Sequence, residues 1–223
     1  MLPHTFPLED RVFGSLLDEI LRKSFQGLFD DLCCCEWYVR EHEVVNLFVF
    51  GHLVPLFLRH QLDLTRIGIE VQVLQVDHSP LQKKKFGARK DIVIWSEAKM
   101  TPSKGVDLSV MRPCLIELRG PGQKPFAVME WKHISRFTKR HKAVCAVEDL
   151  YSKPLCRHVR CEHERDKDWL RENVQGGMLR VGYAVLVDHN THPEVTLMCR
   201  KVLDGSEEDF LTLPAKAGIL GVQ

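Results

Sequence analysis

The sequence has little net charge and no long uninterrupted hydrophobic segment, and both absences exclude broad classes of protein. Its 223 residues include 31 lysines and arginines against 30 aspartates and glutamates, a formal net charge of +1. A uniformly basic surface is therefore excluded, and any charged partner must be bound by a local patch. The longest apolar run, residues 44–58, is interrupted by polar residues and Pro55, and it is shorter than the roughly 20 residues of a membrane-spanning helix. We expect no membrane partner.

We expect neither a disulfide framework nor an export signal. The eight cysteines are irregularly spaced, and three of them are contiguous at residues 33–35. The first residues reach Glu9 without the apolar segment that directs secretion. We therefore expect reduced thiols and a cytoplasmic location. With 44% hydrophobic and 27% charged residues, the composition is that of a globular protein and not of a disordered chain.

Hydrophobic periodicity predicts two helices near the N-terminus. Apolar side chains recur at three- and four-residue steps between residues 9 and 30, which predicts an amphipathic helix that Gly27 and residues 33–35 interrupt. A second helix is expected from about residue 37 to 60, kinked or split near Pro55.

Strand patterns dominate the rest of the chain. Short β-rich runs predict strands at residues 69–76, 91–95, 114–118, 125–132, 181–187 and 195–202. Residues 181–187 are continuously apolar, as expected for a strand buried on both faces. A helix is predicted most clearly over residues 162–175. This order predicts an α/β fold with a mixed central sheet flanked by helices.

We predict one main domain with two appendages. Residues 1–36 are expected to form an N-terminal helical extension, residues 37–204 the main domain, and residues 205–223 a peripheral C-terminal tail. The apolar stripe of the extension is expected to cover the sheet or to form a homodimer.

Three charged residues suited to a divalent-metal site lie on two of the predicted strands. Asp91 opens one strand, and Glu130 and Lys132 lie near the end of another. Because side chains alternate along a strand, Glu130 and Lys132 face one side of the sheet and Trp131 the other. Carboxylates on neighbouring strands suit Mg²⁺ or Mn²⁺. A lysine beside such a metal can hold the attacking water or offset charge on a phosphate, as phosphodiester hydrolysis requires.

This arrangement resembles the PD-(D/E)XK nuclease superfamily. The matching segments are Lys90-Asp91-Ile92-Val93-Ile94 and Val128-Met129-Glu130-Trp131-Lys132. Lys90 stands where the motif has proline. The resemblance covers residues 38–188 and implies a restriction-endonuclease-like αβββαβ core, with an insertion between the strands of Asp91 and Glu130.

The resemblance also implies roles for particular residues. Asp91 and Glu130 would bind a divalent metal, and Lys132 would support the nucleophile. A glutamate on the first core helix often aids the metal site in the family, and Glu41 is preferred to Glu43 because it shares a helical stripe with Val45 and Phe48. The implied activity is that of a Mg²⁺-dependent endonuclease, with DNA favoured over RNA as the substrate.

Basic residues on both sides of the motif predict contacts with nucleic-acid phosphates. One cluster precedes Asp91 and the other follows Glu130. Together the candidate residues are Lys83, Lys84, Lys85, Arg89, Lys90, Arg136, Lys139 and Arg140. Solvated loops are the alternative interpretation of both clusters.

Three other interpretations remain open. The protein could be a non-catalytic member of the same fold that binds nucleic acid or protein, although the complete set of motif residues argues against this. It could be a zinc-stabilised interaction module, built on Cys156, His158, Cys161 and His163. Glu130 and Lys132 could also form an ordinary ion pair on a solvated face, but their strand is otherwise apolar. On the later helix, Arg171 and Gln175 are weaker site candidates.

Overall fold

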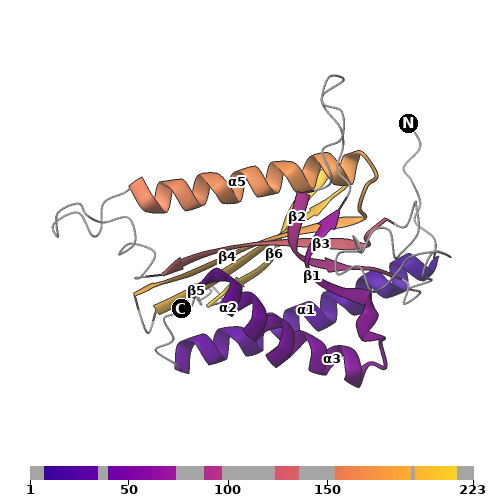
Figure 1. Cartoon of the computed structure of the whole chain (residues 1–223), viewed down its shortest axis with the longest axis horizontal. Helices are drawn as coiled ribbons and strands as arrows, with labels where there is room; N and C mark the ends of the chain where they lie inside the picture. The colour runs from indigo at the N-terminus through magenta and orange to yellow at the C-terminus, as the bar shows by residue number, and fades with distance from the viewer. Residues whose placement is uncertain are drawn as a thin grey trace, which may run out of the picture.

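The computed structural model describes residues 8–34, 40–73, 88–96, 124–135, 154–191 and 194–214. These segments form an α/β protein in which N-terminal helices pack on one face of a six-stranded mixed open sheet (Figure 1). One further helix flanks the other face. Among the helices in these segments, none combines the length and the hydrophobicity needed to cross a membrane. The predicted strand at 114–118 lies outside the described residues.

The first helix, α1 (Leu8–Cys34), runs without interruption through Gly27, so the predicted break at that glycine is wrong. A Cβ atom at Gly27 would lie 2.5 Å from Nδ1 of His52. The glycine therefore permits close packing of the next helical segment. Nε2 of His52 in turn lies 2.9 Å from the Asp31 carboxylate of α1.

The second predicted helix is present but changes its hydrogen-bond spacing twice. It consists of α2 (Glu41–Asn46), a π-helical segment (Leu47–Leu53) and α3 (Val54–Arg59). The change from π to α spacing lies directly before Pro55. Proline has no backbone N–H to donate to the preceding turn, so a change of pattern at this point costs little.

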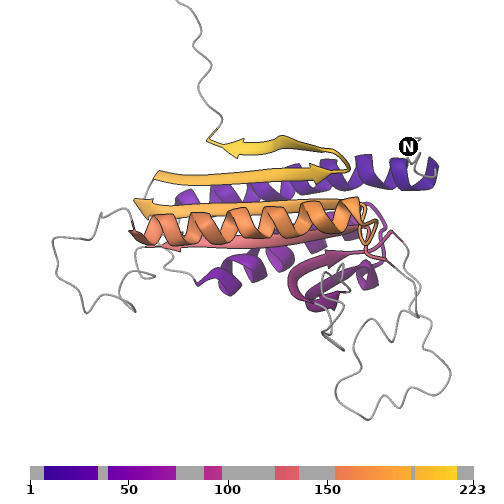
Figure 2. The same ribbon diagram turned by 90° about the horizontal axis from the view of Figure 1, so that it is seen from above.

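The sheet consists of an antiparallel meander, a helical crossover and a second antiparallel set. Its elements are β1 (Ile67–Val73), β2 (Ala88–Ile94), β3 (Ala127–Ser135), α5 (Pro154–Gln175), β4 (Val181–Thr191), β5 (Glu194–Leu203) and β6 (Ser206–Leu213). The strands lie in chain order, and β3 and β4 form the parallel pair (Figure 2). The crossover helix α5 packs on β3 and β4, as a parallel connection requires.

The sixth strand corrects the prediction that the chain beyond residue 204 is peripheral. Residues 206–213 pair with β5 along the edge of the sheet. Phe210 on this strand is 2% exposed and belongs to the main hydrophobic cluster. The run is polar at its start, which conceals its strand pattern.

Two of the three hydrophobic clusters among the described residues hold the layers together. The larger one lies between the sheet and the N-terminal helices, and the smaller one lies between the sheet and α5. In the smaller one, a Cβ atom on Gly182 would lie 2.8 Å from Cβ of Leu170, so this glycine lets α5 approach β4 closely. The predicted double burial of residues 181–187 is confirmed.

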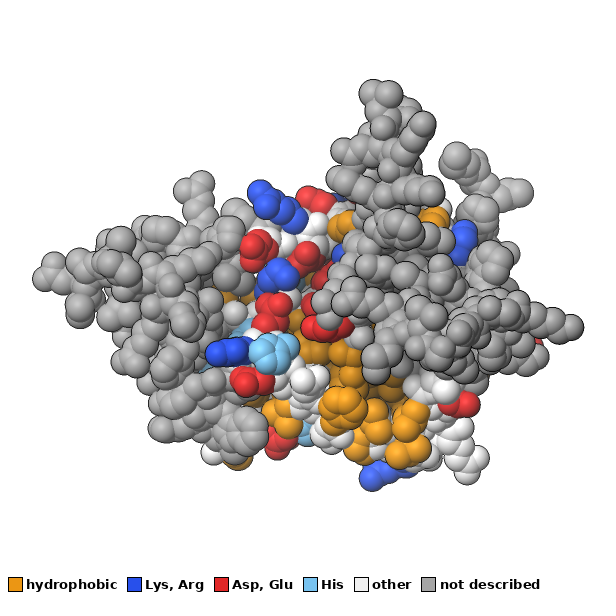
Figure 3. Space-filling view, in the orientation of Figure 1, with side chains coloured by type: hydrophobic (Ala, Val, Ile, Leu, Met, Phe, Trp, Pro, Cys, Tyr) orange, Lys and Arg blue, Asp and Glu red, His pale blue; other side chains and the backbone are white. Residues whose placement is uncertain are grey.

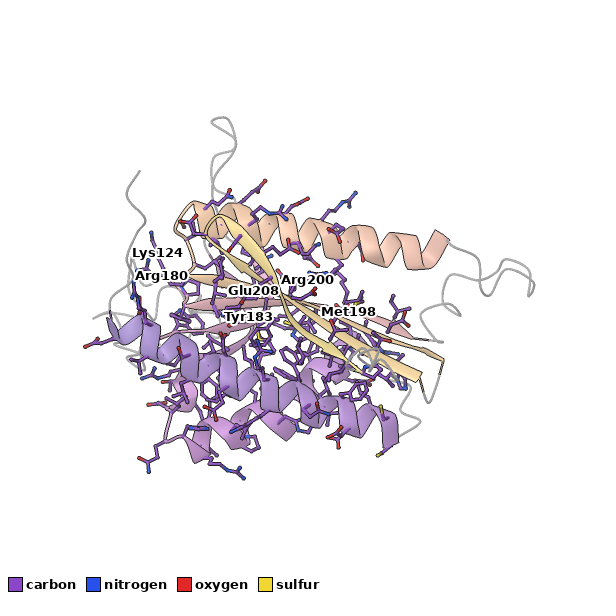
Figure 4. The ribbon with its side chains drawn as sticks, turned by 180° about the vertical axis from the view of Figure 1, so that it is seen from behind. Lys124, Arg180, Tyr183, Met198, Arg200 and Glu208 are labelled. Atoms are coloured by element: carbon purple, nitrogen blue, oxygen red, sulfur yellow. The ribbon has the colours of Figure 1, made fainter. Side chains whose placement is uncertain are left out.

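Polar contacts also fix α1 to the sheet on the side seen in Figure 4. The Tyr183 hydroxyl on β4 donates a hydrogen bond to Oδ1 of Asp18 on α1, 2.5 Å away. Lys201 on β5 forms an ion pair with Oδ2 of the same carboxylate. Asp18 therefore joins α1 to two neighbouring strands.

Candidate active site

The faces of strand β3 are as predicted. The ring of Trp131 is 1% exposed and lies among the N-terminal helices, with its centroid 5.8 Å from that of Phe25 and 4.9 Å from that of Phe48. Nζ of Lys132 points to the other layer and lies 3.0 Å from Oδ2 of Asp166 on α5. Glu130 lies on this second face as well, because it pairs with a lysine that contacts α5.

Where strand β3 no longer pairs with β2, its backbone N–H groups donate hydrogen bonds to carboxylate side chains. The β2–β3 ladder ends at the pair Ile92–Met129. Further along β3, the backbone N–H of Trp131 donates to Oδ2 of Asp91 at 2.8 Å, and that of His133 donates to Oε2 of Glu41 at 3.2 Å. These hydrogen bonds satisfy two backbone donors and hold two acidic side chains, one from β2 and one from α2, side by side along β3.

The backbone of β1 is distorted next to this site. Glu70 has φ of 52°, in the left-handed region that residues other than glycine seldom adopt. Ile69 packs against the cluster under the N-terminal helices, whereas Val71 belongs to the cluster under α5. Regular alternation would place these two residues on the same face, so the strand reverses its faces at Glu70.

Strand β2 reverses its faces at Asp91, which lies opposite Glu70 in the pairing of β1 with β2. Ile92 lies under the N-terminal helices. Lys90 should share that face, but its Nζ lies 3.3 Å from the centroid of the Trp169 ring on α5. The paired distortion of β1 and β2 therefore places Asp91 where β2 leaves β3 and turns Lys90 toward α5.

A cavity of about 490 Å³ opens beside these acidic side chains. It is lined by Glu41, His42, Val45, Asn46, Ile69, Glu70 and Asp91. In the orientation of Figure 1, acidic side chains lie in the middle of the visible face, interspersed with basic ones and beside a hydrophobic area (Figure 3). The cavity gives a ligand access to Glu41, Glu70 and Asp91 from the side of α2, whereas Glu130 and Lys132 do not line it.

Glu130 is paired with Lys90 and not with Lys132. Oε1 of Glu130 and Nζ of Lys90 form an ion pair, and each residue is 6% exposed. Lys90 was predicted to contact nucleic-acid phosphates, but the structure places its ammonium group inside, between Glu130 and Trp169.

Burial and neighbouring charges shift the ionisation of Glu130. Burial raises the pKa of Glu130 to about 7, even though the Lys90 ammonium favours the charged form. The carboxylates of Asp91 and Asp166 raise this pKa further. The raised pKa indicates that the Lys90 ammonium does not fully offset the cost of burying the charged carboxylate, to which the repulsion from Asp91 and Asp166 adds.

Glu41 and Lys132 are shifted by the same group of charges. Burial raises the pKa of Glu41, against the opposing effect of the Lys132 ammonium, and Asp91 adds to the rise. Burial alone would lower the pKa of Lys132, but the carboxylates of Glu41 and Asp166 outweigh it and raise the pKa above its ordinary value. Lys132 is therefore held as a charged ammonium group.

The cluster as a whole fits a divalent cation in charge and in donor type. Its members are Glu41, Lys90, Asp91, Glu130, Lys132 and Asp166. Four carboxylates exceed two ammonium groups, and carboxylate oxygens are the ligands that Mg²⁺ prefers. Within the described part of the chain, no three acidic, histidine or cysteine side chains form a ready-made metal site. The cluster therefore suits a Mg²⁺ ion that is bound by one or two protein carboxylates and keeps water as its other ligands, as is usual for Mg²⁺ in proteins.

Several predicted site residues lie outside the described part of the chain, or have side chains that are not described. Lys83, Lys84, Lys85, Arg136, Lys139 and Arg140 lie outside the described residues, and the side chains of Arg89, Cys156, His158 and Cys161 are likewise not described. His163, the fourth residue of the proposed zinc motif, is buried on α5. The basic clusters and the zinc module remain predictions.

The sequence analysis missed Asp166 as a site residue. Asp166 lies one helical turn before Leu170, which packs on the sheet, so the spacing of the buried stripe on α5 could have identified it. Arg171, which was considered instead, forms ion pairs with Asp168 and with Glu207 on β6.

The chain matches no protein-family model, no curated protein and no solved structure. Its function is therefore inferred from the geometry and chemistry of the cluster around Asp91 and Glu130. The resemblance to the PD-(D/E)XK nuclease superfamily remains a hypothesis.

Proposed function

We propose that this protein is a divalent-metal-dependent nuclease that hydrolyses phosphodiester bonds, with DNA as the substrate. The observation that supports this most directly is that Asp91 lies near enough to both Glu130 and Lys132 to raise the pKa of each. The order of the elements is also that of the PD-(D/E)XK core: a helix, three antiparallel strands, a crossover helix and a strand parallel to the third.

The acidic residues would hold the metal. Asp91 and Glu130 are the proposed ligands, and Glu41 supports them from α2. When bound, Mg²⁺ would polarise the phosphate and lower the pKa of a water molecule. The hydrogen bonds from Trp131 and His133 each occupy one oxygen of Asp91 and Glu41, which fixes these carboxylates before a ligand arrives.

Lys132 would act through its charge. The raised pKa of Lys132 keeps the ammonium protonated, so it suits hydrogen-bond donation to water or phosphate and not proton abstraction. Asp166, 3.0 Å from this ammonium, is a positioning residue that holds it over the site.

A cleavage assay tests the proposal. Plasmid DNA, single-stranded DNA and RNA are incubated with the protein and Mg²⁺ or Mn²⁺, and wild type is compared with Asp91→Asn and Lys132→Met. Each substitution is expected to reduce cleavage by about 100-fold or more. The matched control is Lys167→Met on α5, since that lysine pairs with Glu164 and Glu207, outside the cluster. Cleavage that survives both site substitutions, or that persists in excess chelator, would contradict the proposal.

A binding protein of the same fold that does not hydrolyse its ligand is the second candidate. The Lys90–Glu130 ion pair favours it, because a buried carboxylate that already has a resident ammonium has less need of a metal. The two candidates differ in whether the protein binds a divalent cation through Asp91 and Glu130.

A further inference from the structure

We infer that Lys90 is a resident counter-ion of Glu130 and that a divalent cation enters the site by displacing its ammonium group. The inference rests on the proposed function, because it concerns how the metal required for hydrolysis reaches its ligands. It assigns to Lys90 a role in controlling metal affinity, separate from the contact with phosphate that the sequence predicted.

The position of Lys90 supports this role. Its ammonium group lies between Oε1 of Glu130 and the face of the Trp169 ring, and the side chains of the ion pair are each 7% exposed. The ammonium reaches this place only because β2 reverses its faces at Asp91. A regular strand would direct Lys90 to the face of Ile92, away from Glu130.

A divalent cation can take the place of the Lys90 ammonium beside Glu130. Removing one partner of a buried ion pair leaves an uncompensated charge, so Lys90 leaves Glu130 only when another cation takes over. A divalent cation supplies that charge and is attracted as well by Asp91, which follows Lys90 on β2 and whose Oδ2 is held by the backbone N–H of Trp131, the residue after Glu130 on β3. Lysine is suited to such a displacement because its ammonium is carried on a flexible four-carbon chain.

The inference predicts that Lys90 weakens metal binding in the wild-type protein. Replacing it with methionine keeps an apolar chain of similar length against Trp169 but removes the competing charge. Loss of a charged hydrogen bond of this kind corresponds to a decrease in the dissociation constant for Mg²⁺ by about tenfold or more.

Calorimetric titration of the full chain with MgCl₂ at about pH 9, well above the pKa of about 7 of Glu130, tests this prediction. We expect Lys90→Met to bind Mg²⁺ about tenfold more tightly than wild type, and we expect the matched control Lys167→Met to bind like wild type. Asp91→Asn identifies the site, because it should abolish the binding. Equal or weaker binding by Lys90→Met, with wild-type binding that depends on Asp91, would overturn the inference and leave the proposed function intact. Absence of Mg²⁺ binding in both wild type and Lys90→Met would overturn both.

A second measurement uses the wild-type charge pair and does not depend on the folding of Lys90→Met. Because the ammonium lies 3.3 Å from the Trp169 ring centroid, its departure should change the emission of that tryptophan. The signal is the difference in fluorescence between wild type and Trp169→Phe, followed during the same titration. Mg²⁺ binding that reaches saturation without changing this difference would overturn the inference.

Discussion

Oδ2 of Asp91 accepts a hydrogen bond from the backbone N–H of Trp131, 2.8 Å away, at the place where strands β2 and β3 stop pairing. The side chain thus replaces a strand neighbour, and its orientation is determined by the backbone of β3. Glu41 does the same for the N–H of His133. The acidic wall of the cavity is therefore built by the end of a β-ladder, and a change in that ladder should change the site.

The hydrogen bond of Glu41 predicts that two substitutions will have different effects on the backbone. Glu41→Ala removes the acceptor for His133 N–H and should destabilise the protein by about 1–3 kcal/mol, whereas Glu41→Gln retains an acceptor and should change stability little. Amide hydrogen exchange at His133, measured by NMR, should accelerate only in Glu41→Ala. Both variants should bind Mg²⁺ more weakly if the carboxylate supports the metal. Slow exchange at His133 in Glu41→Ala would show that the hydrogen bond is not important in solution.

The raised pKa of Glu130 predicts how stability depends on pH. In the folded protein the pKa is about 7, and in the unfolded chain it is close to 4.5. Between these values the folded state binds more protons than the unfolded state, so the free energy of unfolding should fall as pH rises from about 5 to 8, by about 3 kcal/mol at most. Urea denaturation at a series of pH values measures this decline.

The control for the pH dependence removes both charges of the buried pair. Lys90→Met/Glu130→Gln removes both titratable groups of the buried pair, so its decline over the same pH range should be smaller than that of wild type. Saturating Mg²⁺ should also reduce the decline in wild type, because a bound metal favours the ionised carboxylate. A decline of equal size in wild type and the double variant would show that Glu130 is not its source.

Gly27 provides a prediction about the packing of α1. In an exposed helix, Gly→Ala would stabilise by about 1 kcal/mol. Here the new Cβ would lie 2.5 Å from Nδ1 of His52, so Gly27→Ala should destabilise by about 1–3 kcal/mol. In a His52→Ala background the same change should become neutral or stabilising. The double-mutant cycle is measured by urea denaturation, and stabilisation by Gly27→Ala alone would contradict the close contact.

The sequence predicted those parts of the fold and the candidate site that depend on simple periodicity. Alternation along β3 correctly placed Trp131 on one face of the sheet and Glu130 and Lys132 on the other, although it did not say which helices cover each face. A continuous apolar run correctly indicated β4, and apolar residues at three- and four-residue steps correctly indicated most of α1. The edge strand β6 was missed because only Phe210 and Leu213 of its eight residues are buried.

The position of Lys90 could not be predicted, because it depends on a local exception to alternation. The positive φ of Glu70 and the reversal at Asp91 arise from the pairing of two strands and leave no periodic pattern in either. Asp166 was missed for a different reason. It is a polar residue on the buried stripe of α5, and Arg171 and Gln175 were considered on that helix instead.

A crystal soaked in Mn²⁺ tests the central claim most directly, since anomalous scattering locates the ion without reference to activity. The account predicts one anomalous peak at about 2.2 Å from carboxylate oxygens of both Asp91 and Glu130, with the Lys90 ammonium moved away from Glu130. Crystals of Asp91→Asn, soaked in the same way, should lack the peak. Wild-type crystals with no anomalous peak at these carboxylates, and with Lys90 still paired to Glu130, would contradict the account.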